Sequence, residues 1–380
     1  MSAAVLTIGV DVRAATGPPC GIGRYGVELA GALLELEDSP KVVLYAASRR
    51  GAAGAARLPA ALRSHQNARL FAPWLPAKLV AALARVPGFR TELITGRLDL
   101  FHHTDLIYVK GFRCPEVVTV HDLAFERSRE FHDPGFHKRV RERMQAAIAR
   151  ARAVVVPSTA TRADLIELWR VDPAKVSVIP LGGDHLLRVA RGERRDPRPD
   201  RSRGYLVHVG TLEPRKNLPR LVRAHRAACR RGLELDLVLV GPWGWRTEEL
   251  REELQRGGAG ALAIARGAVD EPELRAWLED AQALVYPSLC EGFGLPIAEA
   301  FALGVPVVTS ARTSTSEVAG DAALLVDPES EQELADALLE IAEPTRRRDL
   351  AERARRRAPR FTWSATASAT LALYERVTAA

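Results

Sequence analysis

Two glutamates, Glu291 and Glu299, carry the most specific chemistry in the chain. They lie eight residues apart in the segment LCEGFGLPIAEAFALG, where Gly292 and Gly294 allow the backbone to approach a ligand closely and Pro296 suits the first turn of a helix. We expect Glu291 to precede this helix and Glu299 to lie in its first turn, so that both carboxylates face one pocket at the positive end of the helix dipole. A carboxylate accepts two hydrogen bonds at once, which fits the vicinal hydroxyls of a ribose or a hexose. Alternatively, Glu299 only offsets the helix dipole.

Two adjacent cations, Arg215 and Lys216, suit the anionic part of the same ligand. They stand in GTLEPRKN, directly after the apolar run YLVHV and before a helical pattern. Beside a helix N-terminus, such a pair can bind a diphosphate and neutralise the charge that develops as it leaves. A solvated loop with a proline turn is the alternative interpretation of this segment.

Three glycines near the N-terminus, Gly21, Gly23 and Gly26, match the spacing GxGxxG and begin an apolar helical pattern. A dinucleotide fingerprint needs the first glycine directly after a strand and an acidic residue about 20 positions further on. Here eight residues, RAATGPPC, separate the strand pattern LTIGVDV from Gly21, and the next strand pattern ends on Ser48 without an acid. We therefore interpret the glycines as a loop whose amides approach an anion at a helix N-terminus, rather than as a nicotinamide or flavin site.

The elements that must position these groups alternate between short β-branched runs, such as EVVTV and VPVVTS, and amphipathic helical patterns. This alternation predicts parallel α/β layers, in which ligands bind at the carboxyl ends of the strands. The charged segment 185–203 contains few apolar residues and predicts an interdomain linker. We expect two Rossmann-like α/β domains, 1–184 and 204–360, that face each other across a cleft, and a C-terminal helix at 361–380 that packs back on the N-terminal domain.

Composition argues against several classes of protein. The 380 residues carry a net charge of +7, which favours an anionic ligand, but they contain no zinc-finger spacing or aromatic RNA-binding signature, so we expect no nucleic-acid partner. The chain has no apolar run of about 18 residues and no basic leader followed by an apolar segment, so we expect a cytoplasmic protein. The four cysteines show no paired metal-ligand spacing and are expected to be reduced, mostly buried thiols.

Several segments together resemble the retaining family 4 glycosyltransferases, which have the GT-B fold. The resemblance rests on PSLCEGFGLPIAEAFALGVPVVTS, GTLEPRKN and STSEVAGDAALLVDP in the C-terminal half, and on HDLAFE, VVVPSTATRADLIELW and VSVIPLGGD in the N-terminal half. The closing segment FTWSATASATLALYERV adds to it. The resemblance covers nearly the whole chain and weakens over residues 48–100.

The resemblance implies a role for each matching position in binding a nucleotide diphosphate sugar. Lys216 and Arg215 would hold the pyrophosphate, Glu299 the ribose hydroxyls and Glu291 the hydroxyls of the sugar ring. His121, which follows the strand pattern EVVTV, would contact the transferred sugar, and a packed or capping histidine is the alternative. The implied catalytic residues are His121, Arg215, Lys216 and Glu291, and the implied donor-binding positions are Gly21, Gly23, Gly210, Thr211, Val269 beside the base, the backbone of Phe293, Gly294 and Leu295, and Glu299.

Thr211 departs from the family pattern, in which many members have an arginine directly after this glycine. A threonine cannot make the forked, charged contact of an arginine to phosphate, so either Arg215 takes over that contact or the site relies on Lys216 and helix dipoles. His102 and His103, in FHHTDL, are not expected to be catalytic. No metal or other cofactor is expected, because the resemblance is to transferases that generally need none.

The implied reaction moves a hexose, with mannose from GDP-mannose as the first choice, to a saccharide or lipid-linked saccharide in surface polysaccharide or glycoconjugate assembly. Departure of the pyrophosphate leaves an oxocarbenium-like sugar, which the acceptor hydroxyl attacks from the same face, so that configuration is retained. The sequence shows no second carboxylate for a double displacement. A sugar-nucleotide epimerase, a phosphorylase and a non-catalytic nucleotide-sugar-binding or nucleic-acid-binding module are the alternatives.

The segment FAPWLPAKLVAALARVPGFR, residues 71–90, bears on the acceptor. Its Trp74 and leucines, together with Lys78, Arg85 and Arg90, could lie on an anionic membrane surface. The protein would then be peripheral on the inner face of the membrane, and a lipid-linked acceptor would be favoured. An ordinary amphipathic helix over the core fits the same pattern, and we prefer it.

Overall fold

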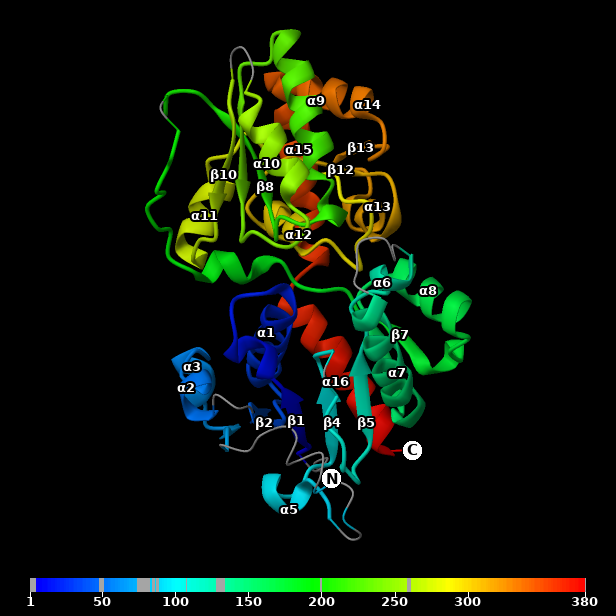
Figure 1. Ribbon diagram of the computed structural model, residues 1–380. Coiled ribbons are helices and arrows are strands. Elements are labelled where there is room, and N and C mark those ends of the chain that lie inside the picture. The colour runs from blue at the N-terminus through cyan, green and yellow to red at the C-terminus, as the bar shows by residue number, and fades with distance from the viewer. Residues whose placement is uncertain are drawn as a thin grey trace. The chain divides into compact units, whose positions relative to one another are not determined.

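The computed structural model describes residues 5–47, 51–73, 83, 86, 89–106, 108–127, 134–198, 200–257 and 261–379 (Figure 1). The chain forms two compact units. Unit 1 comprises Met1–Leu123, His132–Leu181 and Trp363–Ala380, and unit 2 comprises Ala124–Phe131 and Gly182–Thr362. Most of the segment 71–90, which the sequence predicts to be an amphipathic helix over the core or, alternatively, on a membrane, lies outside the described residues. No helix in the described part of the chain is long and apolar enough to cross a membrane.

Unit 1 is built on a parallel sheet of order β3-β2-β1-β4-β5-β6-β7. The central strands are β-branched and buried on both faces, as expected for a parallel sheet covered by helices. Its strands are β1 (Thr7–Asp11), β2 (Lys41–Tyr45), β3 (Ala68–Phe71), β4 (Leu100–His103), β5 (Glu116–Thr119), β6 (Ala153–Val156) and β7 (Val176–Val178). Its helices are η1 (Arg13–Thr16), α1 (Gly21–Leu34), α2 (Gly51–Ala55), α3 (Ala60–Ser64), α5 (Glu92–Thr95), α7 (Pro134–Arg150), α8 (Thr159–Trp169), η3 (Pro173–Lys175) and α16 (Trp363–Ala379).

Unit 2 is built on a second parallel sheet, of order β10-β9-β8-β11-β12-β13, so its strand order reverses between β8 and β11. Its strands are β8 (Tyr205–Val209), β9 (Asp236–Val240), β10 (Ala263–Gly267), β11 (Ala283–Tyr286), β12 (Val307–Ser310) and β13 (Leu324–Val326). Its helices are α6 (Ala124–Arg127), η4 (Asp184–Arg188), η5 (Pro214–Lys216), α9 (Leu218–Arg230), α10 (Glu248–Gln255), α11 (Glu271–Glu279), α12 (Leu295–Ala302), α13 (Thr313–Ala319), α14 (Glu331–Ala342), α15 (Pro344–Arg357) and η6 (Ala358–Arg360).

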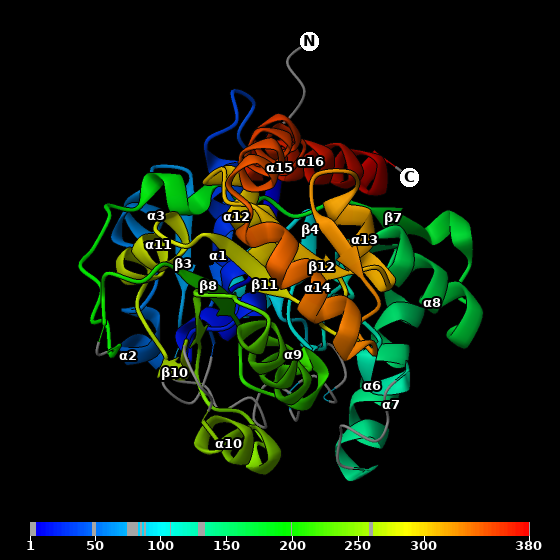
Figure 2. The ribbon, with the colours of Figure 1, turned by 90° about the horizontal axis from the view of Figure 1, so that it is seen from above.

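The core of unit 2 lies between this sheet and the neighbouring helices α9 and α14, which run side by side (Figures 1 and 2). Helix α9 has apolar side chains on one face and arginines on the other, so it buries Leu218, Leu221 and Val222 while its charges stay at the surface. A reversal of strand order places the loops after β8 and β11 next to each other, and this is where ligands bind in open α/β sheets. The loops that carry Lys216 and Glu291 follow these two strands.

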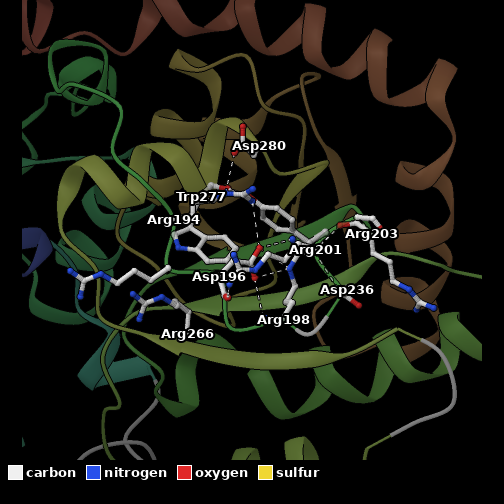
Figure 3. A network of polar contacts seen from close by, with 12 residues as sticks. Arg194, Asp196, Arg198, Arg201, Arg203, Asp236, Arg266, Trp277 and Asp280 are labelled. Carbon is white, nitrogen blue, oxygen red and sulfur yellow. Dashed lines mark hydrogen bonds and ion pairs between the residues drawn. The ribbon is translucent and has the colours of Figure 1, made fainter.

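The predicted linker 185–203 is wrong, because this segment folds as part of unit 2. Three of its charged residues pair with one another and with the sheet, in a cluster that we call the Arg198 network: Arg194, Asp196, Arg198 and Asp236 (Figure 3). Arg198 donates to both oxygens of Asp196 and to Asp236, and its side chain is only 1% exposed. Although most charged residues of the segment are exposed, the buried pair of Asp196 and Arg198 attaches it to unit 2.

The C-terminal helix α16 belongs to unit 1, where it packs against α1. Trp363 and Tyr374 are fully buried, and the Tyr374 hydroxyl lies 2.6 Å from Nδ1 of His102 at the end of β4. The other ring nitrogen of His102, Nε2, lies 2.7 Å from the Thr119 hydroxyl on β5. Tyr374, His102 and Thr119 are far apart in the sequence, and their side chains form one continuous buried hydrogen-bonded network.

Candidate functional site

The loop after β8 presents Lys216 from the short helix η5. Asn217, which follows it, adopts a left-handed backbone conformation (φ 61°) and separates η5 from α9. Its amide Nδ2 donates to the carbonyl of Pro328 at 2.6 Å and to that of Pro287 at 3.2 Å, so the loop is tied to the segments after β13 and β11. Asparagine tolerates this conformation better than most residues, which explains the sequence KN at this turn.

The loop after β11 presents Glu291 and then begins α12. Gly294 takes φ 98° at the N-cap, a conformation that favours glycine, and Pro296 occupies the first turn. The hydroxyl of Ser314 donates to the carbonyl of Glu291 at 2.8 Å and fixes the backbone there. Phe293 is buried and packs edge-on against Phe361.

The expected position of Glu299 in the first turn of this helix is wrong. The helix starts at Leu295, so Glu299 is its fifth residue and lies in the second turn. Its carboxylate lies 3.2 Å from Nε2 of His185, a residue of η4. The glycine before η4 explains this contact, because a Cβ at Gly183 would lie 2.3 Å from the Ala298 carbonyl carbon. Glu299 therefore faces a partner that the sequence did not single out, and it does not cap the helix.

Three of the predicted site residues come together in one buried cluster, which we call the Lys216 network: Glu213, Arg215, Lys216, Tyr286 and Glu291. The Lys216 ammonium lies 2.5 Å from Glu291 Oε1 and 2.5 Å from the Tyr286 hydroxyl. Arg215 donates through Nη1 to Glu291 Oε2 at 2.6 Å and pairs with Glu213 through Nε. The sequence did not indicate the part played by Tyr286, which also donates to Glu291.

The electrostatics of this network depend on its mutual pairing. Burial by itself would raise the pKa of Glu291, but the charges of Arg215 and Lys216 lower it to about 2. Burial, followed by repulsion from Arg215, lowers the pKa of Lys216, and the Glu291 carboxylate opposes this shift. Two cations face two carboxylates, so the cluster is neutral as a set. An anion that binds the two cations must therefore compete with carboxylates already paired with them.

His208 lies beside this network and is a second group that sequence reasoning missed. Its ring stacks on Tyr286 (centroids 5.5 Å apart), and Nδ1 lies 3.0 Å from the carbonyl of Val285. A carbonyl only accepts, so Nδ1 carries the proton and Nε2 is an acceptor. This Nε2 is buried without a partner among the described residues, and a Cβ at Gly210 would lie 3.6 Å from it and 3.8 Å from Lys216 Nζ.

The remaining predicted positions of unit 2 lie on the same carboxyl edge of the sheet. Thr211 packs against Gly244 in the loop after β9, and Val269 stands half-buried two residues after β10. A pocket of about 500 Å³ is lined by Glu213, Arg220, Arg246 and Leu289 among others. It shares Glu213 with the Lys216 network, but Lys216 and Glu291 do not line it.

In unit 1, the structure gives the glycine loop a packing role. Helix α1 begins at Gly21, and the Sγ atom of Cys20 accepts a hydrogen bond from the amide of Gly23 at 3.4 Å. A Cβ at Gly23 would lie 3.0 Å from the Ala15 backbone, so this glycine lets η1 approach the helix. A Cβ at Gly21 would meet nothing within 4 Å. Close packing thus explains why a glycine stands at position 23. Position 21 has open space beside it, where a ligand could approach.

His121 follows β5 and is held in one orientation. Its Nε2 donates to the Thr104 carbonyl at 2.8 Å, and its ring meets Tyr25 edge-on at 5.0 Å. Burial lowers the pKa of His121, which favours the neutral ring. In this tautomer Nδ1 is a hydrogen-bond acceptor, so the group can receive a hydrogen bond from a hydroxyl.

The described residues contain no group of three or more histidine, cysteine or acidic side chains arranged to hold a metal ion. The four cysteines are free thiols, but the expectation that they are mostly buried is wrong, because Cys20 is exposed, Cys114 and Cys229 are half-buried and only Cys290 is buried.

Two family models match the chain. Residues 19–185 match the glycosyltransferase family 4 model, and residues 203–343 match the model of glycosyl transferases group 1. The O-antigen chain mannosyltransferase B of Escherichia coli is 26% identical over 94% of this chain and 96% of its own length. The MMP alpha-(1->4)-mannosyltransferase of Mycolicibacterium hassiacum is 31% identical over 75% of this chain and 72% of its own length.

Solved structures share the fold over nearly the whole chain. A sucrose-phosphate synthase from Thermosynechococcus elongatus has a TM-score of 0.75 at 22% identity and covers 98% of this chain and 99% of its own. The Anabaena protein HepE, solved in complex with UDP and glucose, has a TM-score of 0.71 at 20% identity and covers 98% of this chain and all of its own.

The two Rossmann-like units have the GT-B fold of these solved structures, and the family models and curated relatives make the protein a glycosyltransferase. The chain belongs to the family 4 glycosyltransferases, also described as glycosyl transferases group 1. This confirms the family and the fold class expected from the sequence. The relatives named above are transferases, which favours glycosyl transfer over epimerisation.

Proposed function

We propose that this enzyme transfers a hexose, with retention of configuration and without a metal ion, from a nucleoside diphosphate sugar to a saccharide or lipid-linked saccharide. The observation that carries the proposal is the Lys216 network, which places two cations and the ionised Glu291 at the carboxyl ends of β8 and β11. Mannose from GDP-mannose is the first choice of donor, supported by the two mannosyltransferase relatives.

Each residue has a role that its surroundings permit. Lys216 and Arg215 bind the diphosphate and stabilise the charge that it gains as the anomeric bond breaks. Arg215 thereby takes the place of the arginine missing at Thr211, because it already shares the Glu291 carboxylate with Lys216. Glu299 accepts hydrogen bonds from the ribose hydroxyls, and Glu291 from those of the sugar ring.

The other assigned positions supply neutral contacts. Neutral His121 accepts a hydrogen bond from the transferred sugar through Nδ1, consistent with its tautomer. The backbone of Phe293, Gly294 and Leu295 at the start of α12 faces the phosphates and sugar, Gly21 approaches the phosphates, and Val269 lies against the base. The departing phosphate accepts the proton of the attacking acceptor hydroxyl, so no further carboxylate is required.

A thermal-stability screen against GDP-, UDP-, ADP- and dTDP-sugars tests the donor site. We expect one nucleotide family to raise the Tm, and we expect Lys216→Met and Glu299→Ala to abolish that increase. Lys41→Met, at an exposed position on β2, is the matched control and should retain it. If no nucleotide sugar raises the Tm of the unmodified protein, the proposal fails.

Product analysis tests the reaction itself. With the donor found in the screen and a mixture of saccharide acceptors, NMR of the product should show the anomeric configuration of the donor. Activity should be unchanged by EDTA. An inverted product would exclude attack from the same face, and loss of activity in EDTA that Mg²⁺ restores would exclude a metal-independent transfer.

A further inference from the structure

Glu291 is engaged through both of its carboxylate oxygens. Oε1 accepts from the Lys216 ammonium at 2.5 Å and from the Tyr286 hydroxyl at 2.9 Å, and Oε2 accepts from Arg215 Nη1 at 2.6 Å. These are the two cations that the proposed function assigns to the diphosphate. The carboxylate therefore occupies the hydrogen-bonding positions that phosphate oxygens need.

The side chain can leave these cations without moving the backbone. Ser314 holds the Glu291 carbonyl, and Asn217 holds the loop that carries Lys216, so both backbones are anchored by contacts independent of the carboxylate. Gly292 follows Glu291, and no bulky side chain adjoins it on that side. An exchange of its partners would therefore involve the Glu291 side chain, while the two backbones stay anchored.

The two nucleotides that the site meets differ in what they offer Glu291. A nucleoside diphosphate sugar brings ring hydroxyls, which donate hydrogen bonds to a carboxylate. A free nucleoside diphosphate has none at that end, and its terminal phosphate carries an extra ionisation with a pKa of about 6. The free product is therefore the more anionic ligand, and on charge alone two cations would hold it more tightly than the substrate.

We infer that Glu291 determines the preference of the site for the nucleotide sugar over the free nucleoside diphosphate, by competing with the diphosphate for Arg215 and Lys216. Sugar hydroxyls relieve the competition by giving the carboxylate other partners. After transfer the hydroxyls depart with the sugar, Glu291 returns to the two cations, and the nucleoside diphosphate is displaced. This role rests on the proposed function and adds product release to it.

Glu213 offers a matched comparison, because it is also a buried carboxylate paired with Arg215. Its hydrogen bond with Lys216 joins the two backbones, since the Lys216 amide donates to the Glu213 carbonyl at 3.0 Å. The charge of Glu213 opposes any phosphate, whether or not a sugar is attached. The low pKa of Glu291 keeps this carboxylate ionised at every pH of a normal assay, so its competition does not depend on protonation.

Isothermal titration of GDP, UDP and the corresponding nucleotide sugars into the purified protein and three variants tests the inference. In Glu291→Gln, which keeps the shape and removes the charge, the Kd of the nucleoside diphosphate should fall about 10-fold, equivalent to about 1.4 kcal/mol. The Kd of the nucleotide sugar should stay the same or rise. Glu213→Gln should lower the Kd of the nucleoside diphosphate and the Kd of the nucleotide sugar by the same factor. Glu352→Gln, at an exposed position, should change neither Kd.

The outcomes separate this inference from the proposed function. If the unmodified protein binds neither nucleotide, the proposed donor site fails. If it binds both and Glu291→Gln binds the nucleoside diphosphate no more tightly, the competition is absent and only the inference fails. Tyr286→Phe, which keeps every charge and removes the hydroxyl that donates to Glu291 and accepts from Lys216, gives a second test should Glu291→Gln not fold. It should tighten nucleoside diphosphate binding about 3-fold, and an unchanged Kd would then overturn the inference.

Discussion

Unit 2 contains two buried charge networks that are balanced in different ways. In the Arg198 network, one guanidinium is satisfied on every side: by Asp196, by Asp236, by the Arg203 carbonyl and by the face of Tyr205 (Figure 3). In the Lys216 network, Arg215 keeps 21% of its side chain exposed, and the neighbouring His208 Nε2 has no partner among the described residues.

The difference favours a structural role for the Arg198 network and supports the proposed binding role of the Lys216 network. Asp196 and Arg198 are two residues apart and close their ion pair locally, and Arg198 also joins the segment to the sheet through Asp236 on β9. Arg215 and Glu291 come from separate loops after β8 and β11, where the strand order reverses and a ligand can enter. Burial and ion pairing alone therefore do not identify a binding site. A position where the strand order reverses, together with side chains that have unused hydrogen-bonding capacity, is the better indicator of one.

Lys216→Met should have the largest effect. Removal of a cation that stabilises the leaving diphosphate should lower kcat/KM by about 10²- to 10³-fold, as for the loss of one donor that acts in the transition state. Steady-state kinetics with the donor from the stability screen measures this. Lys41→Met should retain full activity. If the Lys216→Met enzyme had a nearly normal kcat/KM, the diphosphate would have to bind elsewhere. The Lys216 network would then have no binding role to set against the structural role of the Arg198 network.

Arg198→Met should act on stability instead. It leaves two buried carboxylates without their cation, which should cost about 3 kcal/mol of unfolding free energy. Urea unfolding measures the loss, and nucleotide Kd values below the transition should remain within about 2-fold. Arg231→Met, which breaks an exposed pair with Asp336, should change stability little. If Arg198→Met reduced affinity with no loss of stability, this network too would belong to the binding site.

Acid should destabilise the fold through buried histidines. Burial lowers the pKa of His208 to about 3 in the folded protein, against about 6.5 in an unfolded chain. Between these values the unfolded state binds a proton that the folded state does not, so stability falls as the pH drops below about 6.5, by about 2 kcal/mol at pH 5.

Urea unfolding of the protein and of His208→Gln at pH 7.5 and 5.0 measures this contribution. The variant should lose about 2 kcal/mol less than the unmodified protein over that interval. Glu291 contributes only about 0.2 kcal/mol to this window, since its pKa of about 2 and its ordinary value of 4.5 both lie below pH 5. Equal losses in protein and variant would show that His208 is not held neutral beside Lys216.

Glu299→Gln should have the smallest effect of the four. The loss of one charge-assisted acceptor for the ribose hydroxyls should raise the Kd of both the nucleoside diphosphate and the nucleotide sugar about 10-fold. Titration calorimetry measures it, with Glu352→Gln as control. If only the Kd of the nucleotide sugar rose, Glu299 would bind the hydroxyls of the sugar ring. The ribose hydroxyls would then be left to Glu291, the reverse of the proposed assignment.

Sequence patterns alone determined much of this protein. The β-branched runs predicted buried parallel strands, the alternation with helices predicted two α/β units, and the adjacency of Arg215 and Lys216 after one strand predicted an anion site at its carboxyl end. Hydrophobic periodicity and strand-end position are local properties, so they can be read without knowing which segments meet. The family resemblance then supplied the roles of Glu291 and Glu299.

The tertiary structure decided what those groups contact. The segment 185–203 has the composition of a linker, yet Arg198 finds Asp236 on β9 and the segment is bound to unit 2. Glu299 lies in the second turn because α12 starts only after the left-handed Gly294, and it faces His185 from a distant part of the chain. Tyr286 and His208 carry no motif at all. Both side chains affect the site because they are buried beside Lys216. That burial arises only when β8 and β11, which carry them, are packed side by side in one sheet.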